Sequence, residues 1–154
     1  MRIDKRLAEL GITLPEAVPP VANYVPAVRS GSLLFISGQL CLDHGKMKPE
    51  HKGKLGGEVS AEEGYKAARL CAINLLAQAK MALGDLDKIT RCVRLGGFIN
   101  AKPDYAALPA VMNGASDLMV EVLGDAGRHA RTTIGVAELP MDASVEVEAI
   151  FEVA

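Results

Sequence analysis

The segment from Ile89 to Ile99 constrains the fold of this chain most strongly, because it has the pattern of a strand that is apolar on both sides. Its β-branched and apolar residues and its length are typical of a central strand, and Gly96-Gly97 predicts a bulge or a close backbone approach. A strand of this kind needs cover on both faces of its sheet. The rest of the chain therefore has to supply that cover.

Two segments carry the periodicity of amphipathic helices. The first begins at the capping pattern Ser60-Ala61-Glu62-Glu63 and stops at Gly84, and the second runs from about Pro109 to Leu123 and closes at Gly124. Each has an apolar stripe that is expected to face a core. The stripes are Ala68, Ala72, Leu75, Leu76, Ala79 and Leu83 in the first helix, and Leu108, Val111, Met112, Ala115, Leu118, Met119, Val122 and Leu123 in the second.

Strands are expected before and after these helices. Residues Tyr24–Val28 and Leu33–Ser37 flank a turn and predict a hairpin, and residues 131–153 predict two strands around Pro140-Met141-Asp142. The order β-β-α-β-α-β-β predicts an α+β fold in which two helices cover one face of a mixed sheet. Because the second face is also apolar, we expect self-association to cover it.

Two further segments lie outside this framework. Ile3, Leu7 and Leu10 recur at helical spacing before Gly11, which predicts a short N-terminal helix followed by a joint around Pro15, Pro19 and Pro20. We expect residues 1–20 to be an appendage of a single domain that spans 1–154. The polar, glycine-rich residues 43–58 predict a mobile surface loop.

Composition and charge limit the function. The first residues lack the apolar run of a secretory signal, and no stretch approaches the roughly 20 apolar residues that span a bilayer, so we expect a soluble, cytoplasmic protein. The formal net charge of -2 and the low aromatic content argue against a nucleic-acid partner. Cys41, Cys71 and Cys92 have no CxxC spacing and are expected to be reduced structural thiols.

The motifs of nucleotide-binding proteins, metalloproteases and serine hydrolases are absent, and the spacing of the three histidines gives no metal site. Arg131 opens a strand after a glycine-rich joint, where it can grip a carboxylate or, alternatively, pair with Glu146 or Glu148 across a hairpin. Glu146 and Glu148 point the same way along the last strand, whose alternate residues from Val145 to Val153 are apolar. The pattern is compatible with a carboxylate that acts as a general base on water, and equally compatible with a charged strand face exposed to solvent.

The order of these residues resembles the RidA/YjgF family, also named for the L-PSP endoribonuclease. The resemblance covers residues 20–153 and is carried by both ends of the chain and by Asn74-Leu75, Gly84 and Asn113 between them. The matching segments are Asn23-Tyr24-Val25-Pro26-Ala27-Val28, Gly31, Ile36-Ser37-Gly38-Gln39-Leu40, Ala130-Arg131, Gly135-Val136-Ala137-Glu138-Leu139-Pro140 and Val145-Glu146-Val147-Glu148-Ala149.

The resemblance implies a chorismate-mutase-like α+β fold that assembles as a homotrimer, with a central β-barrel and clefts between neighbouring subunits. It also implies hydrolytic deamination of reactive enamines and imines, of the 2-iminobutanoate and 2-iminopropanoate type, to 2-keto acids and ammonia without a cofactor or metal. Two alternatives stay open, namely a non-catalytic trimer that binds small keto or carboxylic acids in the same clefts and the endoribonuclease activity of the family name.

The resemblance also implies roles for particular residues. Arg131 would hold the carboxylate of a small substrate, and Glu146 would orient and activate the attacking water. Tyr24, Gly38 and Asn113 would line the cleft, and the backbone around Thr133 would help to position the imine. Thr133 stands where a cysteine is common in the family, and His129 where a proline often precedes the arginine, so these two positions put the substrate range in question.

Overall fold

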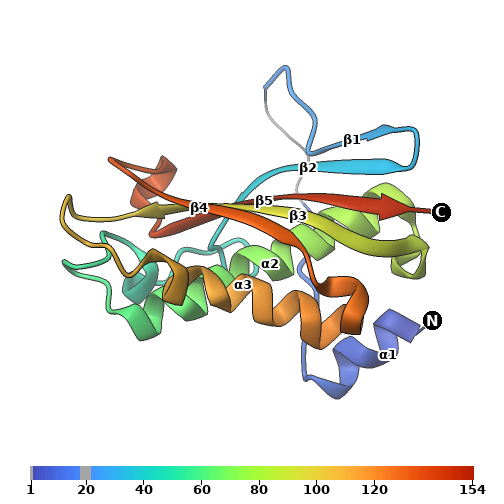
Figure 1. Cartoon of the computed structure of the whole chain (residues 1–154), viewed down its shortest axis with the longest axis horizontal. Coiled ribbons are helices and arrows are strands. Elements are labelled where there is room, and N and C mark those ends of the chain that lie inside the picture. Colours follow the sequence, from blue (N-terminus) through green and yellow to red (C-terminus); the bar gives the residue numbers. More distant parts are fainter. Residues whose placement is uncertain (1, 18–21) are drawn as a thin grey trace.

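The computed structural model describes residues 2–17 and 22–154. Figure 1 shows one twisted sheet with two long helices side by side on one face and a short helix beyond them. The helices are α1 (Arg2–Glu9), α2 (Ala61–Leu83) and α3 (Leu108–Leu123), and the strands are β1 (Ala27–Ser30), β2 (Leu33–Leu40), β3 (Ile89–Asn100), β4 (Ala130–Val136) and β5 (Val145–Val153). The predicted α+β fold with two helices on one face of a mixed sheet is therefore confirmed.

The strand order corrects one prediction. The order is β1-β2-β5-β3-β4, and β4 runs parallel to β3 while every other neighbouring pair is antiparallel. The two last strands are consecutive in the chain but do not form a hairpin, because α3 returns the chain to start β4 beside β3 in the same direction. Arg131 consequently lies opposite Leu95, and the alternative that it pairs with Glu146 or Glu148 across a hairpin is wrong.

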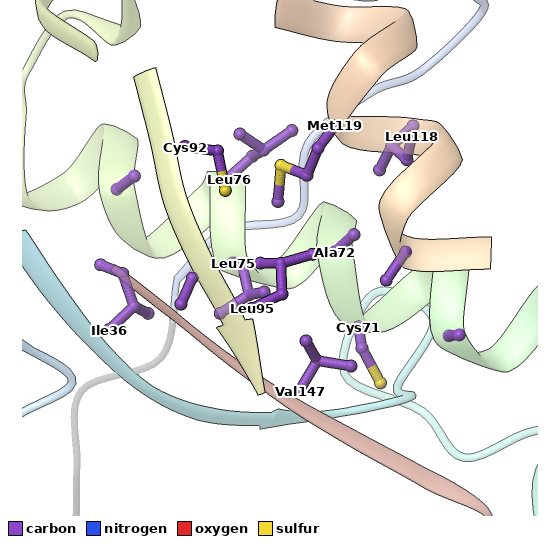
Figure 2. Close-up of a cluster of buried hydrophobic side chains, with 14 of the residues drawn as sticks. Ile36, Cys71, Ala72, Leu75, Leu76, Cys92, Leu95, Leu118, Met119 and Val147 are labelled. Carbon is purple, nitrogen blue, oxygen red and sulfur yellow. The ribbon is translucent and has the colours of Figure 1, made fainter. Parts of the chain in front are cut away.

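The predicted stripes of α2 and α3 face the sheet. Every residue of both stripes is buried except Leu108, which is partly buried against the same core. Figure 2 shows Leu75 of α2 beside Leu95 of the central strand, and Leu76 of α2 and Met119 of α3 nearer to Cys92 of the same strand. Gly97 of β3 allows the predicted close approach, since a Cβ there would meet the side chain of Met112. The predicted alternative of a bulge at these glycines is not observed, because the register shifts of β3 lie nearer the start of the strand.

The N-terminal helix is more than the expected appendage. Ile3 and Leu7 are 0% and 4% exposed and belong to the main core. The carboxylate of Asp87 accepts hydrogen bonds from the backbone N–H groups of Arg2 (2.7 Å) and Ile3 (2.8 Å), which satisfies two donors of the first turn. The expected joint starts at Pro15, whereas Pro19 and Pro20 lie outside the described residues.

The predicted surface loop at residues 43–58 is tied to the core. His51 and Leu55 are buried, and the amide of the fully buried Asn100 donates to the carbonyl groups of Gly53 (3.3 Å) and Ala143 (3.1 Å). The Nζ of Lys54 donates to Oδ1 of Asn100 (2.6 Å). These contacts fasten the loop to the end of β3, and the expected mobility of its exposed residues stays a prediction.

The second face of the sheet is open in the single chain. Val28, Phe35 and Ile134 are 51%, 41% and 46% exposed on three different strands. The expectation of an apolar face that the helices leave uncovered is thus confirmed. Across the ranges that the structure describes, none of the helices has the length and apolarity needed to cross a bilayer.

Candidate functional site

Arg131 lies on the edge strand β4 and turns its guanidinium toward α3. Its Nη1 donates to Oδ1 of Asn113 (2.8 Å) and to Oγ of Ser116 (3.1 Å), and its Nη2 donates to the carbonyl group of Pro109 (3.3 Å). Among the described residues these contacts use three of the five N–H groups, which leaves one on Nε and one on Nη2. This neighbouring pair of donors matches the two oxygens of a carboxylate.

His129 supports the arginine through Ser116. A carbonyl oxygen can only accept, so Nδ1 of His129 carries the proton that it donates to Gly127 (2.6 Å), and Nε2 accepts from the hydroxyl of Ser116 (2.8 Å). Burial lowers the pKa of His129 and the charge of Arg131 lowers it further, although the bond to Gly127 opposes both. The neutral imidazole therefore lies behind the guanidinium as a positioning group.

Thr133 completes this part of the site. It follows Arg131 by two residues on β4, so both side chains lie on the same side of the strand. Its Oγ1 is buried and has no hydrogen-bond partner among the described residues. Arg131, Asn113 and Thr133, three of the predicted site residues, thus lie together where β4 packs on α3, and we call this group the arginine half-site.

Glu146 lies elsewhere, on the face of β5 that points away from the helices. Its carboxylate covers Gly38 so closely that a Cβ there would lie 2.9 Å from Cδ of Glu146, and closer still to Oε2. Glycine therefore makes room for the carboxylate. Burial raises the pKa of Glu146 and the nearby charge of Glu148 raises it further. A carboxylate with a raised pKa is a stronger base toward water.

Tyr24 lies near Gly38. The tyrosine is 58% exposed. It lies before β1, because that strand begins at Ala27, three residues after its predicted start at Tyr24. Both residues line one cavity of about 450 Å³ between the end of β2 and α2. Glu146, Gly38 and Tyr24 form the second group of predicted residues, which we call the glutamate half-site.

One chain does not join the two half-sites. Arg131 is on the edge strand β4 and points to the helix side, whereas Glu146 is two strands away on β5 and points to the open side. A small molecule cannot touch both groups in a single chain, because the sheet itself separates them. A site that uses both has to combine the arginine half-site of one copy with the glutamate half-site of another.

Sequence reasoning missed Ser116 and left the role of His129 open. A signal for Ser116 was present, since it follows Asn113 by three residues on a predicted helix and so shares its face. The link from His129 to Ser116 depends on how the turn at residues 124–127 brings the start of β4 back to α3, and no local pattern gives that distance.

The cysteines belong to neither half-site, although the thiol of Cys71 donates to the carbonyl group of Val145, the residue before Glu146. All three cysteines are free and buried, as expected, and a hydrogen bond with Cys71 is the main cause that lowers the pKa of Cys41 to about 6. Within residues 2–17 and 22–154, no group of three or more histidine, cysteine or acidic side chains is arranged to hold a metal ion.

Comparison with known proteins identifies relatives along the whole chain. The sequence profile of the family described as "YjgF/chorismate mutase-like, putative endoribonuclease" matches residues 4–153. The chain is 46% identical over 154 residues to protein TCP17 of Trypanosoma cruzi, with 98% of this chain and 94% of that protein covered. It is 29% identical to the 2-iminobutanoate/2-iminopropanoate deaminase of Dermatophagoides farinae, with 90% and 92% covered.

The fold has a close match among solved structures. The crystal structure of a putative endoribonuclease from Shewanella oneidensis MR-1 has a TM-score of 0.93 and 35% sequence identity, and the match covers 99% of this chain and all of that one. The match includes the N-terminal helix and the loop at residues 43–58, so these segments are shared with that protein.

Proposed function

Because the chain belongs to the YjgF/chorismate mutase-like family, we propose that it hydrolyses reactive imines and enamines of small amino acids to 2-keto acids and ammonia. The substrates are of the 2-iminobutanoate and 2-iminopropanoate type. The name of the Dermatophagoides farinae relative supports this reaction class. The observation that carries the proposal is the pair of N–H donors that Arg131 keeps free while α3 holds the rest of its guanidinium.

Arg131 binds and orients the substrate in this proposal. The carboxylate of the imine accepts the two remaining N–H groups, which fixes the carbon of the C=N bond relative to the protein. Asn113, Ser116 and Pro109 prevent the guanidinium from following the substrate as it moves. The unpaired hydroxyl of Thr133 lies on the same side of β4 and supplies a further polar contact.

Glu146 activates water in this proposal. The oxygen of water attacks the imine carbon while the carboxylate takes a proton from that water and passes it to the nitrogen. The carboxylate then takes the hydroxyl proton of the resulting carbinolamine and delivers it to the nitrogen, so that the C–N bond breaks, ammonia leaves and the carbonyl of the 2-keto acid forms. The reaction consumes one water and releases one ammonia, and it calls for no cofactor. The raised pKa of Glu146 suits a base that has to accept a proton and return it.

The reaction needs a second copy of the chain, because the two half-sites lie on opposite sides of the sheet. We propose a homotrimer in which the open sheet faces form a central β-barrel, and in which each cleft joins the arginine half-site of one subunit to the glutamate half-site of the next. The exposed apolar residues of the open face, Val28, Phe35 and Ile134, support such burial. A cytoplasmic location remains a prediction.

The test is a coupled assay in which a threonine dehydratase generates 2-iminobutanoate and loss of the imine is followed with and without the protein. Wild type is expected to accelerate the loss, and Arg131→Ala and Glu146→Ala are expected to abolish the acceleration. A matched control is Arg2→Ala, which removes an exposed arginine side chain from α1, outside both half-sites and away from the open sheet face.

Failure of the wild-type protein would favour one of the alternatives. Binding of 2-ketobutyrate without turnover, lost in Arg131→Ala, would indicate a non-catalytic ligand-binding protein. Cleavage of RNA by nuclease-free protein, lost in the same variant, would indicate the endoribonuclease activity. Acceleration that survives both Arg131→Ala and Glu146→Ala would overturn the assignment of the two half-sites.

A further inference from the structure

The cavity beside the glutamate half-site is larger than the ethyl group of 2-iminobutanoate requires. Its volume is about 450 Å³, and it extends from Gly38 of β2 to the side chains of Asn74 and Gln78 on α2. A third wall is formed by residues 15–17, which follow the N-terminal helix. Glu146 is not among the described residues that line the cavity, but Gly38 borders the cavity and also lies against the carboxylate of Glu146, so the cavity begins next to the glutamate half-site.

Gln78 has an unused polar group in this cavity wall. Its side chain is 7% exposed, and its Oε1 is buried without a hydrogen-bond partner among the described residues. A buried amide is normally paired, so an unpaired one beside a cavity points to a partner that enters the cavity. The partner of an amide oxygen has to be an N–H or O–H donor.

The other amide groups of the wall add to this preference for donors. Both hydrogens of the Asn74 amide are used by the carbonyl groups of Leu40 (3.0 Å) and Leu42 (2.9 Å), so its oxygen is the group left over. The described residues that line the cavity include no lysine, arginine or histidine, and Glu16 is the one charged residue among them. An acidic side chain would therefore enter the cavity without a counter-charge.

A charged amine is also poorly matched. Glu16 is exposed to solvent, where its charge is screened, and the rest of the wall is apolar or neutral. Burying an ammonium group against neutral amides costs more than burying a carboxamide, which can donate to Gln78 and Asn74 and accept from the NH₂ group of Gln78. The chemistry of the wall thus favours an uncharged amide.

We propose that this cavity is a side-chain subsite that selects imines with a carboxamide side chain, such as the imine derived from glutamine, over imines with acidic or cationic side chains. The N-terminal segment gives the subsite its third wall, since α1 is fastened to the core by Ile3 and Leu7 and so holds residues 15–17 at the cavity. The proposal rests on the imine hydrolysis proposed above for its substrate, but the binding preference can be measured without turnover.

The activity test uses an L-amino-acid oxidase to generate imines from glutamine, glutamate, lysine and 2-aminobutyrate, with loss of each imine followed in the presence of the protein. The kcat/KM for the glutamine imine is expected to exceed those for the glutamate and lysine imines about tenfold or more. Gln78→Met keeps the length of the side chain and removes the amide, and it should lower the ratio of the glutamine to the 2-aminobutyrate value about tenfold. Met81→Gln, on the exposed side of α2, is the matched control and should leave the ratio unchanged.

The binding test is independent of activity. The side-chain NH₂ signals of Gln78, assigned by their loss in Gln78→Met, are followed by NMR during titration with propionamide, propionate and propylammonium. Propionamide alone is expected to shift them. Shifts by propionamide in a protein that hydrolyses no imine would uphold the subsite and reject the proposed function. Imine hydrolysis with no preference among side chains, together with unmoved Gln78 signals, would overturn the subsite and leave the proposed function standing.

Discussion

Substituting Gly38 by alanine tests whether the position of Glu146 matters. The added Cβ would lie 2.9 Å from Cδ of Glu146 and nearer to Oε2, whereas ordinary contacts are 3.4–4 Å. The carboxylate therefore has to move by about 1 Å, and a displacement of this size at a reacting group typically costs about 100-fold in rate. That factor corresponds to about 2.7 kcal/mol of transition-state stabilisation. We expect kcat/KM for 2-iminobutanoate to fall by about that factor in Gly38→Ala.

The same substitution should leave the fold intact. The φ of Gly38 is not in the left-handed region, and the neighbouring atoms belong to a movable side chain, so alanine fits the backbone. Restriction of the unfolded chain stabilises a compatible Gly→Ala variant by about 0.4–1 kcal/mol. Gly135→Ala on β4, where a Cβ meets nothing nearer than 3.6 Å, is the control. Activity of Gly38→Ala within threefold of wild type, in a protein that melts no lower than wild type, would refute the claim that Glu146 has to occupy its observed position.

Four further predictions follow from the contacts of single residues. Arg131→Lys keeps the charge but loses the paired donors, so KM should rise and kcat/KM should fall about 100-fold in the imine assay. An unchanged KM would contradict the two hydrogen bonds proposed between Arg131 and the substrate carboxylate. Ser116→Ala disconnects His129 from Arg131 and should lower kcat/KM about tenfold, while a wild-type value would show that the guanidinium needs no such support. Asn100→Ala leaves buried carbonyl groups unpaired and removes one of the two acceptors of the Lys54 ammonium, the other being the carbonyl group of Ala137, so it should cost about 3 kcal/mol in urea unfolding. A loss below about 1 kcal/mol would argue against its role as anchor of the loop. Burial raises the pKa of Glu146, so ionisation of this carboxyl group destabilises the folded chain as the pH rises through that pKa. E146Q should therefore melt at a higher temperature than wild type at pH 7, and this difference should disappear below the ordinary pKa of 4.5. Equal melting temperatures at every pH would contradict the raised pKa.

The helices and the strands could be predicted from the sequence because their signals are local. The spacing of Leu75, Leu76 and Ala79 places them on one side of a helix, and the alternation from Val145 to Val153 places every second residue on one side of a strand. Ser60 accepts a hydrogen bond from the backbone N–H of Glu63 (3.2 Å), as the capping pattern predicted. Each of these features depends only on residues that are near one another in the chain.

The order of the strands could not be predicted in this way. Whether β5 pairs with β4 or inserts between β2 and β3 depends on the path of α3 and on contacts between segments far apart in the sequence. The same limit applies to the site. Arg131 and Glu146 were predicted to act together, and the residues that hold each of them became visible only once β4 was placed at the edge and β5 inside the sheet.

The central claim is that a working site joins the arginine half-site of one copy to the glutamate half-site of another. The most direct test mixes Arg131→Ala and Glu146→Ala proteins, lets the subunits exchange under mild denaturation and assays 2-iminobutanoate hydrolysis. Each variant alone should be inactive. In a one-to-one mixture about a quarter of the clefts should combine an intact Arg131 with an intact Glu146, so about a quarter of the wild-type activity should return. A mixture that exchanges subunits, shown by mass spectrometry of the mixed assembly, and that remains inactive would contradict the claim.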